Sequence, residues 1–434
     1  MNAPSDEDVL PARLQRRNSL VFLLNNSLAY LVAPVFYVGV LHAAILESLA
    51  ASDTVANLPE AVYLWVAPLP VLVAWLWPSP RLMRPLLTAA LLLMGTAGFV
   101  VAALFAAAPR SWLIPVMVAH AAIIGVGNGV RTMCLWELIG RGLSPERRGW
   151  TLAWTFGLGP LFAVVGSCAS QLVLSGNFLD VIRTPPVPTP WNYVALFGAT
   201  GPVMWLAAAL VGLAHVPPQA EPDSQTRVAD VIEGLRQYFL QPLILITAVA
   251  MLMTYGGTMI MNNLSLYARD AIGEPPEQYA GLQLALRFGF KCVAGFALGW
   301  LVTRVHAKAS LLATTATCLA GVCWGLFVPG KWYLLSFGLL GAGELFYVYY
   351  MNYIVASSPP QRIRENTAYT NLITVTVGFM PLLFGVVSDF HGLRASFGLA
   401  ITIFAAAMLI VGLGLPRQPT VPVEPEELIQ QASS

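Results

Sequence analysis

The sequence predicts an all-α membrane protein with twelve transmembrane helices in two six-helix bundles. Of its 434 residues, 57% are apolar and only 10% are charged, whereas soluble domains have about 45–50% and about 25%. So few charges cannot cover a surface that faces water, which argues against a soluble enzyme or a disordered chain. Basic and acidic residues nearly cancel, at 23 and 22, so the charge indicates no nucleic-acid partner. We therefore expect the lipid bilayer to surround most of the chain.

Twelve apolar runs approach the roughly 20 residues that a helix needs to cross the hydrocarbon core. They lie near 19–43, 60–77, 85–107, 113–136, 150–174, 192–214, 243–266, 280–302, 309–328, 332–355, 367–388 and 396–415. The stretch Leu86–Leu93 is apolar on all sides, which favours helices over the alternating strands of a membrane barrel. The acidic start at Asp6, Glu7 and Asp8 is unlike a signal peptide, so the first run is expected to stay as a membrane helix.

The distribution of basic residues predicts the orientation. If the N-terminus is cytoplasmic, fifteen of the 23 basic residues fall in cytoplasmic segments, five on the opposite side and three inside spans. This excess satisfies the positive-inside rule, so we expect both termini to be cytoplasmic. The abundance of Arg and Ala is typical of a GC-rich bacterial genome. We therefore expect an integral protein of the bacterial inner (plasma) membrane.

The chain is predicted to contain two related halves joined by a linker. We expect a tail at 1–18, bundles at 19–214 and 243–415, an amphipathic linker helix within 215–242, and a tail at 416–434. Gly157–Phe162 in the fifth span resembles Gly378–Phe384 in the eleventh, 221 residues later. Repeated halves with a cytoplasmic linker are typical of a carrier that alternates around a central site.

Motifs in and next to the loops resemble those of one known protein family. Four segments carry it: Pro145–Gly149, Leu266–Asp270, Gly299–Lys308 and Gly385–Gly392. In these segments the sequence resembles the major facilitator superfamily, with no subfamily assigned. The resemblance implies the twelve-helix fold of that family, a secondary transporter that acts as a monomer, and gating or loop roles for seven matching residues. These are Arg148, Gly149, Gly299, Arg304, Lys308, Gly385 and Asp389.

The sequence also departs from the family pattern. Thr303 stands where the family has an Asp that helps to latch the two halves, and the first-half copy of this motif is reduced to Pro78–Arg84. The fifth span keeps only Gly159 and Pro160 of the glycine motif of drug antiporters. This latch and the drug-antiporter assignment are therefore open.

Charged residues at membrane depth are the main candidates for a site, because each costs roughly 2.5–3.5 kcal/mol to insert and usually faces a cavity or a partner. Arg287 and Lys291 lie four residues apart and share a helix face. Lys291 and Glu344 each lie about 16 Å from the outer ends of their spans, and Arg131 and His120 share a face of the fourth span. The resemblance places all five on cavity-lining helices.

These residues predict a cavity that attracts anions. Arg287, Lys291 and Arg131 would bind the substrate, and Glu344 and His120 would exchange protons. Alternatives are open: Lys291 and Glu344 form a structural pair, Arg131 extends to the membrane surface, and His120 is a packing residue. Further substrate-binding candidates are polar or aromatic residues within spans, namely Tyr30, Tyr255, Tyr347 and Asn262.

The sequence therefore predicts a proton-coupled secondary transporter for a small organic solute, and Arg287 and Lys291 lead to the hypothesis that this solute is anionic. Efflux of hydrophobic compounds is an alternative function, as is a non-transporting protein that binds pigment, lipid or a partner. No enzyme, cofactor or metal is expected: the sequence has no Gly-rich phosphate loop with Lys-Ser/Thr, no metal-ligand spacing and no Cys-x-x-Cys pair.

Overall fold

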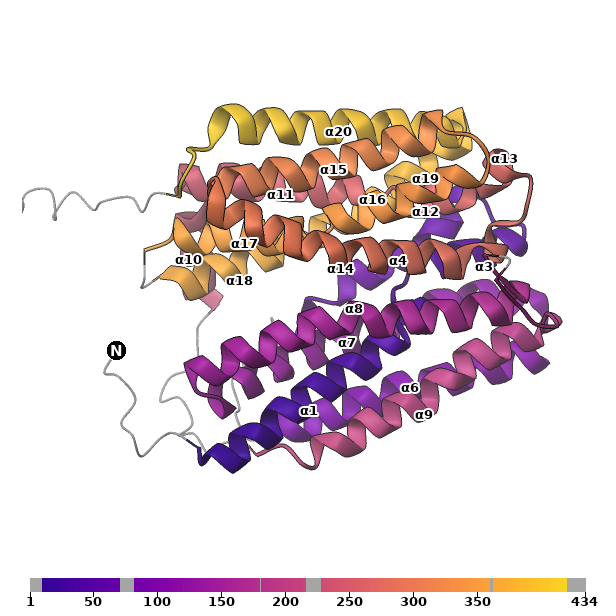
Figure 1. Cartoon of the computed structure of the whole chain (residues 1–434), viewed down its shortest axis with the longest axis horizontal. Coiled ribbons are helices and arrows are strands. Elements are labelled where there is room, and N and C mark those ends of the chain that lie inside the picture. Colours follow the sequence, from indigo (N-terminus) through magenta and orange to yellow (C-terminus); the bar gives the residue numbers. More distant parts are fainter. Residues whose placement is uncertain (1–9, 71–81, 180, 216–227, 360–361, 420–434) are drawn as a thin grey trace, which may run out of the picture.

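The computed structural model describes residues 10–70, 82–179, 181–215, 228–359 and 362–419. Two helical bundles lie side by side, one above the other in Figure 1. The N-terminal bundle contains α1 (Ala12–Leu31), α2 (Ala33–Phe36), α3 (Val40–Ser48), α4 (Asp53–Val66), α6 (Met83–Ala107), α7 (Arg110–Gly142), α8 (Pro145–Ser175) and α9 (Trp191–Val211).

The linker helix α10 (Val228–Phe239) leads into the C-terminal bundle. That bundle contains α11 (Pro242–Thr258), α12 (Met261–Leu266), α13 (Ala268–Ile272), η3 (Pro276–Gln278), α14 (Ala280–Arg304), α15 (Ala307–Phe327), η4 (Gly330–Leu334), α16 (Leu335–Gly343), α17 (Phe346–Ala356), α18 (Ile363–Ile373), η6 (Thr374–Gly378), α19 (Phe379–His391) and α20 (Leu393–Gly414).

Ten helical segments among the described residues are long and apolar enough to cross a membrane. They correspond to the third to twelfth expected spans. The first expected span is divided into α1, α2 and α3. The second, expected at 60–77, begins within α4, and its residues 71–77 lie outside the described part. The chain is an integral membrane protein, and its architecture agrees with the predicted twelve-helix fold.

Several spans that the sequence predicts as single helices are divided. The first is interrupted at Val32 and again at Tyr37–Gly39, where Gly39 has a φ of +152°. The seventh is interrupted at Met259–Ile260 and the tenth at Glu344–Leu345. Hydropathy does not detect these breaks, because the residues around them remain apolar. They lie on spans that carry candidate site residues, as is common in transporters.

A short hairpin was also missed by the sequence analysis. Strands β1 (Asn177–Phe178) and β2 (Ile182–Arg183) pair in antiparallel register, with Asn177 opposite Arg183. They follow α8, whose last turn ends at Gly176 with a φ of +67°. Such two-residue strands are too short to have a periodic sequence pattern.

The two bundles contact each other near one end of the molecule. We call this the far end; it is where α3 ends and α4 begins. The opposite end, where α1 begins, α7 ends and α10 lies, is the linker end. At the far end α4 packs against α19 and α8 against α14. The bundles diverge toward the linker end, on the left of Figure 1.

Glycines make the contacts at the far end close. An added Cβ at Gly385 would lie 2.6 Å from the Cα of Thr54, and one at Gly281 would lie 2.6 Å from the Cβ of Gln171. Gln171 also accepts a hydrogen bond of 2.8 Å from the backbone N–H of Leu282. Small residues thus allow helix backbones of different bundles to touch.

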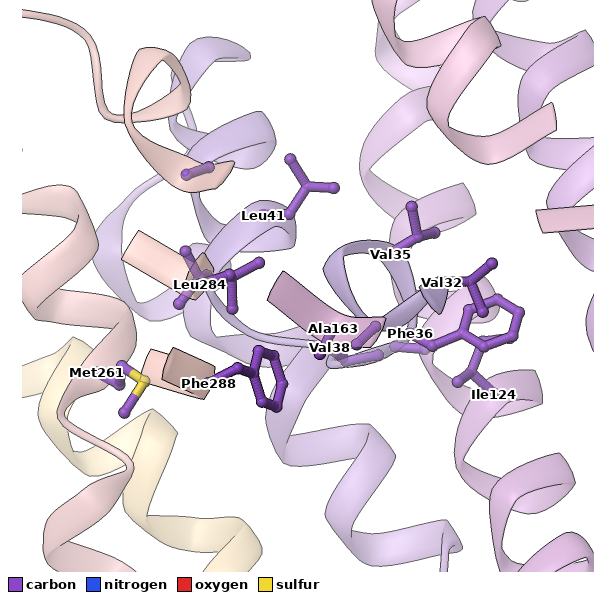
Figure 2. Close-up of a cluster of buried hydrophobic side chains, with 14 of the residues drawn as sticks. Val32, Val35, Phe36, Val38, Leu41, Ile124, Ala163, Met261, Leu284 and Phe288 are labelled. Atoms are coloured by element: carbon purple, nitrogen blue, oxygen red, sulfur yellow. The ribbon is translucent and has the colours of Figure 1, made fainter. Parts of the chain in front are cut away.

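Apolar side chains from both bundles fill the space beside the break in the first span. Phe36 and Val38 of the N-terminal bundle and Leu284 and Phe288 of the C-terminal bundle belong to one buried cluster (Figure 2). The ring of Phe288 stands edge-on to Tyr37, with 5.1 Å between their centroids. This cluster supports the apposed bundles at mid-depth.

The linker helix α10 is attached to the C-terminal bundle. Tyr238 is fully buried, and its hydroxyl shares a 2.9 Å hydrogen bond with Thr370 of α18. Gly234 lies against the hydroxyl of Tyr369, and Arg362 donates a hydrogen bond to Gln237. Any movement of this bundle against the other therefore carries α10 with it.

The contact between α1 and α8 gives a test of the packing. An added Cβ at Gly166 would lie 1.9 Å from the carbonyl oxygen of Leu31, whereas one at Gly157 on the same helix would meet nothing within 4 Å. Overpacking of this kind costs about 1–3 kcal/mol. We therefore expect Gly166→Ala to lower the melting temperature in detergent, and the matched Gly157→Ala variant to leave it equal or higher. Equal melting temperatures for the two variants would contradict this packing.

Candidate functional site

Arg131 of α7 is held inside the N-terminal bundle by neutral amides. Its Nη2 donates to Asn26 at 2.8 Å, its Nε to Asn25 at 3.2 Å and its Nη1 to Asn128 at 3.3 Å. The residue is 8% exposed, so it does not extend to the membrane surface. Within the described residues no carboxylate lies at ion-pair distance from it. Arg131 therefore contributes a positive charge that no acidic side chain compensates there.

Arg131 lines a cavity of about 260 Å³. Aromatic side chains form much of its wall, and the amides of Asn26 and Asn128 contribute polar edges. Trp136, which lies closer to the linker end on α7, belongs to the wall and is 48% exposed. The cavity thus joins one cation to an aromatic surface, and it reaches toward the end where the bundles diverge.

Arg287, Lys291 and Glu344 of the C-terminal bundle form a buried ion cluster. Glu344 lies at the break between α16 and α17, and its two carboxylate oxygens pair separately with the cations. Oε1 pairs with Nη2 of Arg287, and Oε2 with Nζ of Lys291 at 3.3 Å. The predicted pair of Lys291 and Glu344 is present, but Arg287 is an additional partner, so two cations share one carboxylate.

Tyrosines lie between this cluster and Arg131. The guanidinium of Arg287 lies 5.3 Å from the ring centroid of Tyr37. Tyr30 interacts with Tyr37, and it is close enough to both Lys291 and Arg131 for electrostatic interaction with them. Both tyrosines line the cavity. The candidate Tyr30 thus lies where the two charged groups face each other across the bundles.

Glu60 is a half-buried carboxylate between the bundles that the sequence analysis missed. Its Oε2 accepts a 2.6 Å hydrogen bond from Nδ2 of Asn262, a predicted site residue on α12. Glu60 is the first residue of the second predicted span, 60–77, and it was not counted among the charges at membrane depth. The sequence did contain a signal for this helix. Ser52 caps α4 and Asp53 occupies its first turn, which is a typical helix start, and it places Glu60 seven residues inside the helix.

Three other candidates lie away from Arg131. His120 is buried against His42, with 3.1 Å between Nδ1 of His120 and Nε2 of His42, inside the N-terminal bundle. Tyr255 packs on Phe346 with 5.6 Å between ring centroids. Tyr347 is 38% exposed and donates a hydrogen bond to Asn371. His120 and Tyr255 are thus packed against other side chains. The structure does not bring His120 close to Glu344, the other predicted proton-exchanging residue.

The motif residues at the linker end form local contacts. Nη2 of Arg148 donates to the carbonyl of Gly140 near the end of α7. Nζ of Lys308 donates to the carbonyls of Gly412 and Leu415 at the end of α20, at 2.7 and 2.8 Å. Cations favour such helix C-termini. Gly149 and Arg304 are exposed, and Gly299 lies within α14.

Asp389 of the motif in α19 joins the two bundles at the far end. Its carboxylate accepts hydrogen bonds from the backbone N–H groups of Asp53 and Thr54, at 2.8 and 3.2 Å, and from the Thr54 hydroxyl at 2.6 Å. An anion at a helix N-terminus is favourable because the first N–H groups lack partners within the helix. We call this contact the far-end latch. An ion pair of Glu47 with Arg269, at 2.6 Å, also joins the bundles there.

The comparisons with known proteins agree with this fold. The family model described as Major Facilitator Superfamily matches residues 252–434. No curated protein matches the sequence significantly. The structure thus defines a membrane protein of two helical bundles, and its C-terminal part matches the sequence model of that family.

Solved structures extend the likeness to nearly the whole chain. A nucleoside transporter is 11% identical with a TM-score of 0.66, over 91% of this chain and 99% of that one. A bacterial homologue of the human lysosomal transporter Spinster (inward-facing, unoccupied) and a D-xylose–proton symporter are both 15% identical, with TM-scores of 0.64 over 93% of this chain and 97% of theirs. These structures show that nearly the whole chain shares their fold. The family model over residues 252–434 agrees with the resemblance to the major facilitator superfamily deduced from the motifs.

The far-end latch should respond to pH. Burial raises the pKa of Asp53 from 3.8 to about 6, and the carboxylates of Asp389, Glu47 and Asp270 add to this rise. A carboxyl whose pKa is higher in the closed contact favours that contact when protonated, and the benefit is lost as the pH rises from about 4 through about 6. We expect the Thr54 amide to lose protection from hydrogen exchange over this range, after correction for the intrinsic rate.

The Asp53→Asn variant is the matched control for this prediction. It removes the titrating carboxyl but leaves the backbone N–H groups that bind Asp389. We expect its Thr54 amide to stay protected across the same range. A loss of protection identical to that of the unmodified protein would show that Asp53 is not the responsible group.

Proposed function

We propose that this protein is a secondary transporter that moves a small organic anion by alternating access, driven by protons. The observation that carries the proposal is the excess of positive charge in and beside the cavity: Arg131 lines it, and Arg287 lies against Tyr37 of its wall. Arg131 lies among neutral amides, and Arg287 and Lys291 share Glu344. A carboxylate or phosphate group on a substrate would compensate this charge through strong, charge-assisted hydrogen bonds.

The arrangement of contacts supports alternating access. The hydrogen bonds and ion pairs between the bundles described above lie in the far half of the molecule, and the cavity wall extends toward the linker end. With the linker end cytoplasmic, as the basic residues predict, this conformation accepts its substrate from the cytoplasm. Opening the far end would require the latch at Asp389 and the ion pair of Glu47 with Arg269 to separate.

Proton coupling is proposed for the ion cluster. Protonation of Glu344 would free Arg287 and Lys291 to bind the substrate anion, and the substrate would in turn favour release of the cations from Glu344. Nε of Arg287 is already buried without a hydrogen-bond partner among the described residues, so it is available to an additional acceptor. Similarity to a D-xylose–proton symporter agrees with a proton-linked mechanism.

Efflux of a hydrophobic compound is the second candidate. The aromatic cavity wall favours it, with Phe22, Tyr30, Phe36 and Trp136 as contributors. The partial drug-antiporter motif does not add support, because Gly159 has a local packing role: an added Cβ there would lie 2.5 Å from the ring of Tyr30. An anion that also has an aromatic or apolar group could pair with Arg131 and pack against the aromatic side chains of the cavity wall.

Transport by reconstituted protein tests the function. We expect proteoliposomes to exchange at least one class of solute in a panel of aromatic and aliphatic carboxylates, phosphate esters, neutral sugars and nucleosides, with anions preferred and accumulation dependent on a pH gradient. Arg131→Gln should reduce exchange of the preferred anion by about 10- to 100-fold, because a hydrogen bond to a charged group contributes about 1.5–3 kcal/mol.

Arg141→Gln is the matched control on the same helix. Arg141 pairs with Glu137 near the linker end, so its loss should leave exchange close to that of the unmodified protein. Equal exchange by the Arg131→Gln variant would contradict a role of this residue in substrate binding. Preference for a neutral solute, with no effect of Arg131→Gln, would favour the efflux function.

A further inference from the structure

We propose that Glu60 is a second proton-binding site, distinct from Glu344, and that its protonation favours closure of the far end. The inference deepens the proposed function and depends on it only for the alternation of two states. Glu60 lies on α4 about 10 Å inside the helix start, at 1.5 Å per residue. It therefore lies between the far-end latch and the cavity.

Glu60 is half-buried where the two bundles meet. Nδ2 of Asn262 donates to Glu60 at 2.6 Å and also to Oδ1 of Asn57 at 3.0 Å. On its other side Glu60 lies against Gly39, where an added Cβ would be 3.3 Å from Oε1 and 2.8 Å from Oδ1 of Asn262. The backbone of Gly39, just before α3, thus completes a polar site formed with α4 and α12.

A hydrogen-bonded chain extends this site into the C-terminal bundle. Nδ2 of Asn57 donates to Oδ1 of Asn263 at 2.7 Å, and Nδ2 of Asn263 donates to Ser388 and Ser396 at 2.7 and 3.0 Å. Ser388 directly precedes Asp389 of the latch. Separation of the bundles at the far end would therefore break the hydrogen bonds of Glu60 together with the latch.

Among the described residues, the cation that faces the Glu60 carboxylate is Arg287, which Glu60 shares with Glu344. The charged side chains that face it are Arg287 and Glu344, and Tyr63 and Tyr255 are the nearest other titratable groups. Arg287 is paired with Glu344 in this conformation. An ionised carboxylate buried without a cation of its own is costly, whereas a protonated carboxyl keeps the hydrogen bond from Asn262 without that cost.

This imbalance couples protonation to conformation. In the open state the carboxylate of Glu60 contacts water at the far end and binds a proton from it. The far end then closes over a neutral group. If Arg287 leaves Glu344 and pairs with Glu60, the ionised form is stabilised, and the proton passes to water in the cavity. One proton is thereby carried across the closed contact in each cycle.

Spin-label distances across the far end test the inference without a substrate. Ser111 and Lys331 are exposed at that end of opposite bundles, and both are changed to Cys in a chain whose five native cysteines are changed to Ala. Asp53→Asn is also included to remove the titration of the latch. As the pH falls from about 8 to about 5, a range that includes raised carboxyl pKa values, we expect the short-distance population to increase. With Glu60→Gln added, that population should be large and independent of pH.

Two further variants keep the test specific. Glu60→Asp retains a titrating carboxyl and should retain a pH response. Glu137→Gln removes a carboxylate at the linker end and should leave the response unchanged, with monodisperse protein as the criterion of folding for each variant. An unchanged pH response in the Glu60→Gln variant would overturn the inference. So would the absence of any pH response in the protein that retains Glu60, or a distance population that changes with sodium concentration at constant pH.

The same measurements separate this inference from the proposed function. If the pH response is lost in Glu60→Gln but proteoliposomes exchange no solute of the panel, the proton site stands and the transport proposal fails. If exchange of an anion depends on Arg131 while Glu60→Gln keeps the pH response, transport stands and the proton site fails.

Discussion

A buried charge inside a membrane protein needs a partner, and this requirement organises the centre of the molecule. Two cations of the C-terminal bundle share Glu344, and a third cation, Arg131, is solvated by three asparagine amides of the N-terminal bundle. Glu60 meets the other bundle through Asn262. The partner of Glu60 comes from the other bundle and is lost when the bundles separate. The burial of this carboxylate therefore depends on conformation, whereas the other central charges keep partners within their own bundle.

The sequence placed Arg287 and Lys291 one helical turn apart and Glu344 at a similar depth. It offered the pair of Lys291 with Glu344 as an alternative, but it did not predict that Arg287 would be a second partner. It did not predict Glu60, whose helix begins before the apolar run that marked the span. Nor did it predict that the third cation would have only amide partners among the described residues, because Asn25 and Asn26 lie more than one hundred residues from Arg131 in sequence. Hydropathy reports depth in the membrane, not contacts between helices.

Three of the four motif segments lie within residues 252–434, which the family model matches, but the contacts of the motif residues required the structure. Lys308 donates hydrogen bonds to the end of α20. In the same motif, Thr303 stands where the family has an Asp. A contact between a carboxylate and a helix N-terminus is nevertheless present at the far end, between Asp389 and α4. The breaks in the first, seventh and tenth spans were also invisible in hydropathy, although they position Tyr37, Asn262 and Glu344.

The central claim is that the bundles alternate around the cavity, with the far end closing and opening in each cycle. A crosslink across that end tests it most directly. Glu47 and Arg269 form an ion pair between the bundles at 2.6 Å, so Glu47→Cys and Arg269→Cys can be joined by a short thiol crosslinker. We predict that crosslinking stops exchange of the preferred solute while each single variant, treated identically, continues it. Undiminished exchange by the fully crosslinked protein would contradict the account.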